Sequence, residues 1–279
     1  ENLSGESVIS QTDWTMDHSG HGTFVSGIIA ARDNDHGLLG VAPEAKIHVL
    51  KIFDESGTAY SSDLISALYR CRDVGAKIIS MSLAGFSGVQ EERELFAELY
   101  EKNGILSIAS AGNSGSDEYI YPASYSNVIS VGAIDRRKEI ALFSTRNNLV
   151  DIVAPGLDVW STLPANYDCL ICTEKHTSGY ASLDGTSFSA PFVAGVAALL
   201  WGTNTTLNVD YIRNALLASA QDLGRPGRDG SYGEGLVQAV EALKTLQATV
   251  SGEQPLLDWS DRAIDTNDPL KVPLSCSED

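Results

Sequence analysis

The sequence predicts an α/β fold in which a parallel β-sheet is covered by helices on both faces, so that the domain has three layers. Short runs of β-branched residues alternate along the chain with longer segments of helical periodicity. A parallel sheet requires this alternation, because the crossover between two parallel strands is usually a helix. With 279 residues, 43% of them hydrophobic, the chain can bury one large core, and we expect a single domain.

The predicted elements follow one another in order. Four runs bounded by Gly, Pro or Asn are predicted as buried strands, at residues 46–52, 77–82, 105–110 and 127–131. Two segments of helical period lie between the first three of these runs, at residues 61–74 and 89–103. We therefore expect strands that are joined by covering helices.

The longest apolar run, residues 190–201, is interrupted by Pro191 and Gly195. It is shorter than the roughly 20 residues of a membrane span, so it predicts a buried helix and no span. Two further helices are predicted at residues 209–220 and 236–246.

Past these helices the composition of the chain changes. From about Ala248 it becomes acidic and contains prolines, without sustained periodicity. We expect a folded domain over residues 1–247 and an acidic C-terminal tail or linker over residues 248–279.

Charge and cysteine content limit the classes of partner. The formal net charge of −18, from 37 acidic and 19 basic residues, repels nucleic acid and anionic membranes. Four cysteines are too few for a disulfide scaffold. Cys169 and Cys172, followed by His176, would need a fourth ligand to hold zinc, so a disulfide to another cysteine or two free thiols is favoured.

The strongest chemical signal is the segment LDGTSFSAP at residues 183–191, in which a glycine turn leads Ser187 into the first turn of an apolar helix. A serine at a helix start is often an ordinary cap. The free N–H groups and the positive end of the helix dipole would also stabilise an oxyanion there. The position therefore suits a nucleophile, provided that a base takes its proton.

The segment HSGHGTFVSG at residues 18–27 places His21 at the start of a second apolar helix. An imidazole with an ordinary pKa of about 6.5 suits proton transfer at neutral pH. His21 is the only one of the five histidines with glycine on both sides, which gives a reactant close access to the ring. His21 is therefore a candidate general base, although a histidine taken alone is more often structural.

The segment IASAGNSG at residues 108–115 ends a predicted strand in glycine followed by Asn113. Ligands bind at the carboxyl ends of strands in open parallel sheets. The Asn113 amide can therefore donate to a developing oxyanion, although a turn asparagine is the commoner role in isolation.

Together these segments resemble the subtilisin-like serine proteases, in which the histidine of His-Gly-Thr, the asparagine of Ala-Gly-Asn and the serine of Gly-Thr-Ser occur in this order and at similar spacings. Shorter motifs also match, namely GVAP at 40–43, SMSL at 80–83, YPA at 121–123, VAPG at 153–156 and GEGL at 233–236. The resemblance extends from about residue 18 to residue 246. It implies a secreted or extracytoplasmic endopeptidase with polypeptide substrates, no required cofactor, and an upstream pro-segment or inhibitor as a further partner.

By this resemblance, Ser187 attacks the peptide carbonyl to form an acyl-enzyme and His21 takes and returns the proton. Asn113 and the Ser187 backbone N–H hold the oxyanion. Substrate would add as a strand beside one edge formed by Ser82, Leu83, Ala84 and Gly85, and an opposite edge at residues 57–60 that ends in Tyr60. Ala84 replaces the glycine usual in the family, which works against close approach of the substrate backbone.

The resemblance also implies a specificity pocket between Ala111, Gly112 and Asn113 on one side and Ile120 on the other. The branched side chain of Ile120 would narrow this pocket, and no acidic residue matches its floor. We expect a moderate apolar residue such as Leu, rather than Arg or Lys, before the cleaved bond.

The family's catalytic acid lies in Asp-Ser/Thr-Gly at the end of the first core strand, roughly thirty or more residues before the histidine, and only twenty residues precede His21. Asp13 and Asp17 follow no apolar strand and lack the Ser/Thr-Gly sequence, so both are predicted to be surface loop residues. We expect the domain to lack its first strand or strands and the catalytic Asp, which would leave a sheet edge or a slot in the core. Loss of the acid costs on the order of 10⁴ in turnover, so the chain alone is predicted to be nearly inactive.

Two other functions compete with that of a peptidase. A catalytically inactive binding domain on the same fold is the main alternative, because the acid is absent, although the presence of His21, Asn113 and Ser187 together favours an enzyme. A nucleotide-binding loop at residues 20–22 is rejected, because the third glycine comes only at Gly27 and no buried strand precedes the loop.

The loop RDNDHGL at residues 32–38 matches a calcium loop of the family. The resemblance implies the Asn34 side chain and the carbonyls of Arg32, His36 and Leu38 as ligands, and oxygen ligands suit structural calcium. Two ligands expected from further upstream are missing, and a solvated acidic turn is the alternative.

Overall fold

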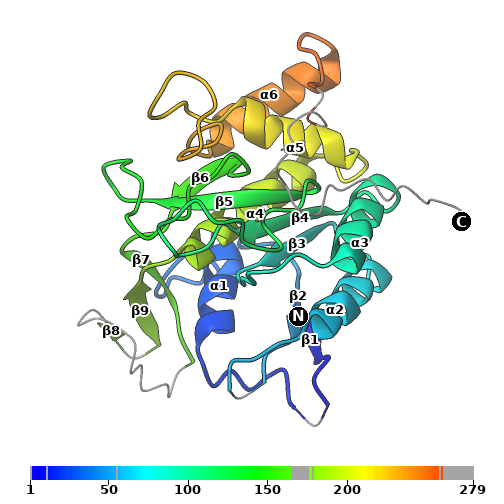
Figure 1. Cartoon of the computed structure of the whole chain (residues 1–279), viewed down its shortest axis with the longest axis vertical. Coiled ribbons are helices and arrows are strands. Elements are labelled where there is room, and N and C mark those ends of the chain that lie inside the picture. Colours follow the sequence, from blue (N-terminus) through cyan, green and yellow to red (C-terminus); the bar gives the residue numbers. More distant parts are fainter. Residues whose placement is uncertain are drawn as a thin grey trace, which may run out of the picture.

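The computed structural model describes residues 2–10, 12–54, 56–164, 176–177, 179–257 and 259 (Figure 1). Its main sheet is parallel, in the order β3 (Ile78–Met81), β4 (Leu106–Ser110), β5 (Val128–Ile134) and β6 (Ile152–Pro155). Every residue of β4 and β5 is buried, as expected for strands covered on both faces. The predicted α/β class is confirmed.

Two further parallel strands form a separate sheet. Strand β1 (Leu3–Ser7) pairs with β2 (Ile47–Lys51), with Leu3 opposite Ile47 and Ser7 opposite Lys51. Because β2 and β3 each lie at the end of their sheet, one edge of each pairs with no other strand that the structure describes. The parallel strands of the described residues therefore lie in two sheets, each with an open edge.

Strand β1 was not predicted, because its sequence LSGES lacks β-branched residues. Its glycine has a packing reason instead. A Cβ at Gly5 would lie 2.6 Å from the Trp14 ring and 2.6 Å from the carbonyl oxygen of Val49. Close approach of these neighbours therefore fixes a strand that local preference does not indicate.

Helices cover both faces of the main sheet (Figure 1). On one face, α2 (Ser61–Asp73) and α3 (Gln90–Glu101) pack over side chains of β3 and β4. On the other face, α4 (Thr186–Thr203) lies against β4, β5 and β6 and is backed by α5 (Val209–Ala218) and α6 (Ala239–Ser251). These helices and the sheet between them make the three predicted layers.

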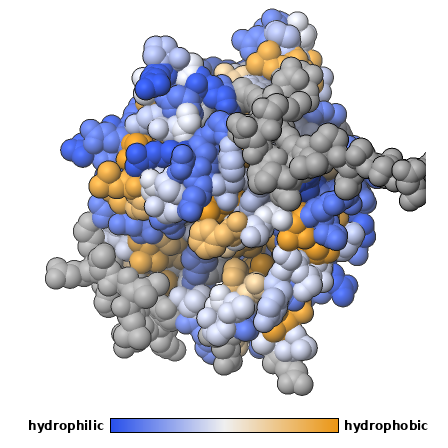
Figure 2. All heavy atoms as spheres, in the orientation of Figure 1, coloured by the Kyte–Doolittle hydropathy of each residue, from blue (hydrophilic) through white to orange (hydrophobic). Residues whose placement is uncertain are grey.

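Helix α4 is the core helix predicted from the apolar run. By length and composition alone it is the one described helix that could cross a membrane, but two thirds of its apolar window is buried inside the protein. The surface in Figure 2 is mainly hydrophilic with scattered apolar residues, as the net charge suggests. Packing against the sheet therefore accounts for the apolar character of α4.

A small antiparallel sheet was missed by the sequence prediction. It has the order β7 (Val159–Thr162), β9 (Tyr180–Leu183) and β8 (His176–Thr177). Cys169 and Cys172 lie outside the described residues, as does the side chain of His176. The sheet packs against α1 (His21–Ala30), because the Ser161 hydroxyl donates to the Phe24 carbonyl at 2.7 Å and the Thr162 hydroxyl donates to the Thr23 carbonyl at 3.0 Å.

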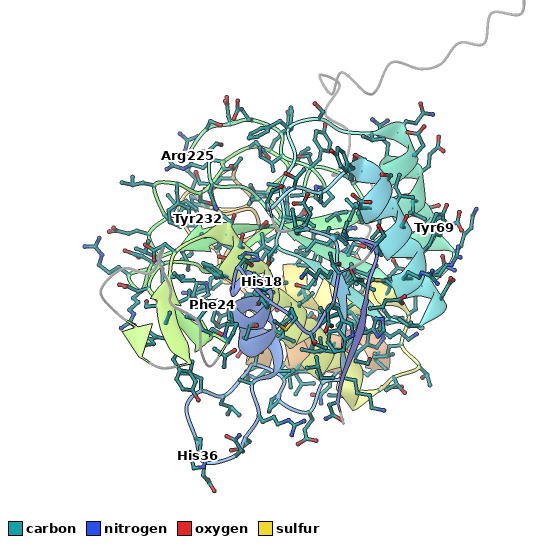
Figure 3. All side chains as sticks on the ribbon, turned by 90° about the horizontal axis from the view of Figure 1, so that it is seen from below. His18, Phe24, His36, Tyr69, Arg225 and Tyr232 are labelled. Carbon is teal, nitrogen blue, oxygen red and sulfur yellow. The ribbon has the colours of Figure 1, made fainter. Side chains whose placement is uncertain are left out.

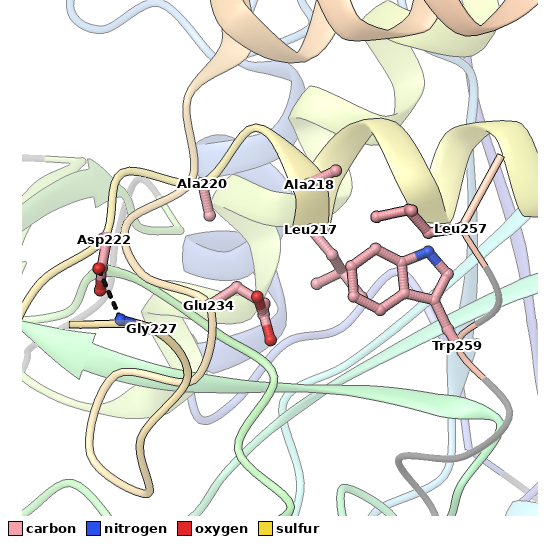
Figure 4. A pocket seen from close by; sticks show the side chains of 8 residues that line it. All are labelled: Leu217, Ala218, Ala220, Asp222, Gly227, Glu234, Leu257 and Trp259. Carbon is pink, nitrogen blue, oxygen red and sulfur yellow. Dashed lines mark hydrogen bonds between the residues drawn. The ribbon is translucent and has the colours of Figure 1, made fainter. Parts of the chain in front are cut away.

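The C-terminal part of the domain continues past the boundary predicted at residue 247. Helix α6 runs to Ser251, and the Leu257 backbone N–H donates to the Asn214 side chain at 3.2 Å. Trp259 packs against the helical core beside α5 (Figure 4). Residues 260–279, most of the predicted tail, lie outside the described residues.

Candidate active site

Ser187 is the second residue of α4, where the predicted glycine turn is found. Gly185 caps the helix with φ 155° and ψ 152°, a conformation that favours glycine. The Ser82 hydroxyl, just after β3, donates to the Ser187 carbonyl oxygen at 2.5 Å. The end of a core strand is thereby tied to the start of the helix that carries the predicted nucleophile.

Asn113 is attached to this helix start through Thr186. Its side-chain oxygen accepts the Thr186 backbone N–H at 2.9 Å and the Thr186 hydroxyl at 2.7 Å. That hydroxyl also accepts the Gly112 backbone N–H at 3.2 Å, and Thr186 is completely buried. With its oxygen so engaged, Asn113 keeps its amide N–H groups available to an acceptor beside Ser187.

His21 is the first residue of α1, and the start of this helix is built around Asp17. The Asp17 carboxylate accepts the backbone N–H groups of Gly20 at 2.9 Å and of Thr23 at 2.7 Å, together with the Thr23 hydroxyl at 2.7 Å. Asp17 lies in the loop before α1, as predicted, and is half-buried. Its carboxylate also has a capping role, because it accepts the Thr23 backbone N–H, a donor left free at the helix start. Asp13 is exposed, as predicted.

The imidazole of His21 lies beside α4. Its ring centroid is 5.8 Å from that of Phe188, the residue after Ser187. Burial lowers the pKa of His21 below its usual value, while the Asp17 carboxylate raises it in part. Within the described residues, neither the His21 ring nor the Ser187 hydroxyl makes a hydrogen bond, and catalytic hydrogen bonds are often long before substrate binds.

The predicted substrate edge lies directly beyond β3. Gly85 exchanges two backbone hydrogen bonds with Tyr121, at 2.8 and 2.9 Å, which fixes the far end of the segment. Between Ser82 and Gly85, Leu83 is half-buried and Ala84 is exposed. On the opposite edge, Tyr60 is 71% exposed at the start of α2.

The residues predicted to wall the specificity pocket meet at Gly112. A Cβ on this residue, whose φ is 105°, would lie 2.8 Å from Ile120 Cγ1 and 2.9 Å from Thr145 Oγ1. Ile120 is only 2% exposed and Ala111 only 3% exposed. The branched side chain therefore fills the space beside Gly112.

The predicted calcium loop is exposed, and Figure 3 shows His36 at its far end. The Asn34 side-chain oxygen accepts the His36 backbone N–H at 3.3 Å, and Asp35 and Gly37 have positive φ. No group of three His, Cys, Asp or Glu side chains with metal-binding geometry occurs in the described part of the chain. An amide oxygen and backbone carbonyls still form a donor set that suits calcium.

A cavity of about 450 Å³ lies elsewhere, between α5 and the C-terminal residues (Figure 4). None of the residues predicted for catalysis line it.

The fold and this grouping of side chains define a three-layer α/β protein with a serine and a histidine at the starts of two adjoining helices. The model of the subtilase family matches residues 4–235. The chain is 38% identical over 244 residues to Subtilisin DY of Bacillus licheniformis, which covers 86% of this chain and 83% of that protein. Subtilisin Savinase of Lederbergia lenta is 38% identical over 240 residues, with the same two coverages.

A solved structure gives the same result. The crystal structure of the psychrophilic subtilisin-like protease Apa1 from the Antarctic psychrotroph Pseudoalteromonas sp. AS-11 superposes with a TM-score of 0.78, at 25% identity. The match covers 87% of this chain and 88% of that one. The chain belongs to the subtilase family, a family of serine peptidases, which confirms the resemblance found in the sequence.

Three residues that organise the site were missed or given other roles in the sequence analysis. Thr186 holds the Asn113 amide, Asp17 organises the start of α1, and Phe188 contacts His21. A signal for Asp17 was present, since an Asp shortly before a helix start is a common cap. The contacts of Thr186 and Phe188 join segments far apart in sequence and leave no local signal.

Proposed function

We propose that the protein is a serine endopeptidase that hydrolyses peptide bonds through an acyl-enzyme on Ser187. The observation that carries this proposal is a continuous set of contacts linking the three predicted residues. Asn113 bonds to Thr186, Ser187 follows Thr186, and Phe188 contacts His21. These contacts, made through Thr186 and Phe188, support a single site that includes residues 21, 113 and 187.

In the proposed reaction, the neutral His21 imidazole accepts the Ser187 proton as the hydroxyl oxygen attacks the peptide carbonyl. The carbonyl oxygen becomes an oxyanion, stabilised by the Asn113 amide and the Ser187 backbone N–H. His21 then protonates the leaving amine, and water releases the acyl group by the same steps in reverse. The hydrogen bonds from Thr186 support the role of Asn113 as oxyanion donor, because they hold the Asn113 oxygen away from the oxyanion.

The proposal requires a carboxylate that accepts a hydrogen bond from the His21 ring, and none of the described residues supplies one. Asp17 bonds to its own loop and the start of α1, with no hydrogen bond to the imidazole. We propose that the acid comes from a further parallel strand, because the edges of β2 and β3 are both open to one. The chain alone would then turn over about 10⁴-fold more slowly than the completed site.

A fluorophosphonate probe distinguishes the proposed enzyme from the alternative, a catalytically inactive binding domain. This reagent phosphonylates a serine that has both a base and an oxyanion site, even when turnover is slow. We expect labelling at neutral pH that maps to Ser187 and is abolished by Ser187→Ala. Absence of labelling, in this chain and in a form that contains the upstream strand, would leave the binding domain.

We further propose polypeptide substrates with a moderate apolar residue such as Leu before the cleaved bond. The buried Ile120 side chain beside Gly112 supports this, because it reduces the space for a long side chain. A peptide-library cleavage profile measures the preference. A profile dominated by Arg and Lys would refute it.

Calcium binding by the loop at residues 32–38, and a secreted or extracytoplasmic location with an upstream pro-segment or inhibitor, are proposals drawn from the family. For calcium, the Asn34 oxygen and the carbonyls of Arg32, His36 and Leu38 would hold the ion and stabilise the loop. We expect added calcium to raise the melting temperature of the protein and Asn34→Ala to weaken the effect. An equal response from both proteins would exclude this loop.

A further inference from the structure

The Phe188 ring joins the two helices that carry the proposed catalytic residues. Its centroid is 4.5 Å from that of Phe24 on α1, at an interplanar angle of 50°, and 5.8 Å from that of His21, at 48°. Tilted rings at these separations attract one another. Phe188 follows Ser187 directly, and Phe24 lies one turn after His21 (Figure 3 labels Phe24). The same ring is therefore next to the nucleophile in sequence and next to the base in space.

The position of the Phe188 ring is fixed by its surroundings. Phe188 is 5% exposed and Phe24 is fully buried. Both belong to a small apolar cluster completed by Ile28, Val159, Leu163 and Ala181. A side chain packed this closely has few alternative rotamers.

The imidazole of His21 is held differently. The ring makes no hydrogen bond to any described residue, so packing must limit its rotation. We propose, on the basis of the proposed function, that Phe188 is a positioning residue whose ring sets the orientation of the His21 imidazole relative to Ser187. It acts through its tilted ring contact with the imidazole and by packing α1 against α4 through Phe24.

Phe188 also excludes water from one side of the imidazole. Burial is the largest cause of the lowered pKa of His21, and the one charged group that opposes it is Asp17. Because burial disfavours the imidazolium, loss of the Phe188 ring should raise the His21 pKa toward its ordinary value. This effect separates positioning from simple packing, because a structural side chain elsewhere in α4 would not change the titration of His21.

The test compares Phe188→Leu with Phe192→Leu. Phe192 lies on the same helix and packs against the same apolar cluster, without a ring contact to His21. The His21 pKa is followed by NMR in the intact chain, with its signal assigned from His21→Ala, and the rate of fluorophosphonate labelling at Ser187 is measured in parallel. We expect Phe188→Leu to raise the His21 pKa by roughly half a unit and to slow labelling roughly tenfold.

Phe188→Tyr retains the ring and should restore both values, and Phe192→Leu should leave both close to wild type. Should Phe188→Leu fold poorly, Phe188→Met removes the ring with less loss of volume. Equal effects of Phe188→Leu and Phe192→Leu on the pKa and the rate would overturn the proposal. If no protein is labelled, including wild type in this chain and in a form that contains the upstream strand, the proposed function fails, while the NMR titration still decides whether Phe188 positions His21.

Discussion

The two helix starts that form the site are built in contrasting ways. Around Ser187, side chains from three distant segments are joined by short hydrogen bonds, from Ser82 at 2.5 Å and between Thr186 and Asn113 at 2.7 Å. Around His21, the Asp17 carboxylate accepts hydrogen bonds from the backbone. The imidazole itself is held only by packing against the Phe188 ring. The described residues thus supply the hydrogen bonds that hold the proposed nucleophile and oxyanion amide. The imidazole of the proposed base still lacks a hydrogen-bond partner.

This contrast predicts that the oxyanion site works independently of the missing carboxylate. Replacing Asn113 with alanine removes one donor to the oxyanion and should slow phosphonylation of Ser187 about a hundredfold or more. Asn103→Ala, an exposed position at the end of α3, is the matched control. If the Asn113 variant is labelled within twofold of the wild-type rate, Asn113 is not an oxyanion donor.

A smaller effect is expected at Thr186, which acts through Asn113. Thr186→Val keeps the shape but removes the hydroxyl that donates to Asn113 and accepts from Gly112. We expect roughly tenfold slower labelling, and a loss of about 1–3 kcal/mol in the free energy of unfolding, because the buried Gly112 N–H loses its acceptor. Thr186→Ser keeps the hydroxyl and should be labelled at the wild-type rate. If Thr186→Ser is labelled slowly although its free energy of unfolding is unchanged, the hydrogen bond is not the cause of the slower labelling.

Around His21, Asp17→Ala should mainly lower the free energy of unfolding. Loss of a helix-capping side chain costs about 1–2 kcal/mol, whereas Asp13→Ala, at an exposed turn, should cost far less. Burial would raise the pKa of Asp17, but hydrogen bonds from Thr23, Gly20 and Ser19 outweigh it and lower the pKa overall. A carboxylate with a lowered pKa stabilises the fold above its unfolded pKa, so the Asp17→Ala deficit should disappear as pH falls through the lowered folded value. Urea unfolding at pH 7 and at about pH 3 measures this, and a deficit that is the same at both values would contradict it.

The smallest expected effect is a shift of the pH profile. Because burial lowers the pKa of His21, the neutral base persists below its ordinary value, and the labelling rate should reach half its maximum below about pH 6.5. Asp17→Ala removes a charge that raises this pKa, so the midpoint should fall further. Asp73→Ala, at the exposed end of α2, is the control. A midpoint that rises in Asp17→Ala would show that the carboxylate does not act on His21 through its charge.

The same contrast explains what the sequence could predict. The proposed nucleophile, oxyanion amide and base each lie in a short motif whose glycines and helix start are local features, so they could be proposed without a structure. Strand β1 could not, because Gly5 is required by the contact with Trp14 rather than by strand preference. The capping role of Asp17 was missed because the residue was compared only with the family's acid motif. Phe188 was missed because its role depends on how α4 meets α1.

For the predicted calcium loop and the cysteines, too, the local sequence does not decide the role. Asn34 fits a ligand by type, but the donors that would complete the site come from other parts of the fold. Cys169 and Cys172 lie outside the described residues, so the sequence expectation of a disulfide or free thiols stands as a prediction.

The central claim, that Ser187 and His21 form one reactive site, is tested most directly by the rate of fluorophosphonate labelling at Ser187 in wild type and in His21→Ala. The labelled residue is identified by mass spectrometry, at pH 7 and equal protein concentration. We predict a rate at least roughly a hundredfold lower in His21→Ala, because the hydroxyl then has no base. Equal rates in the two proteins would contradict the claim.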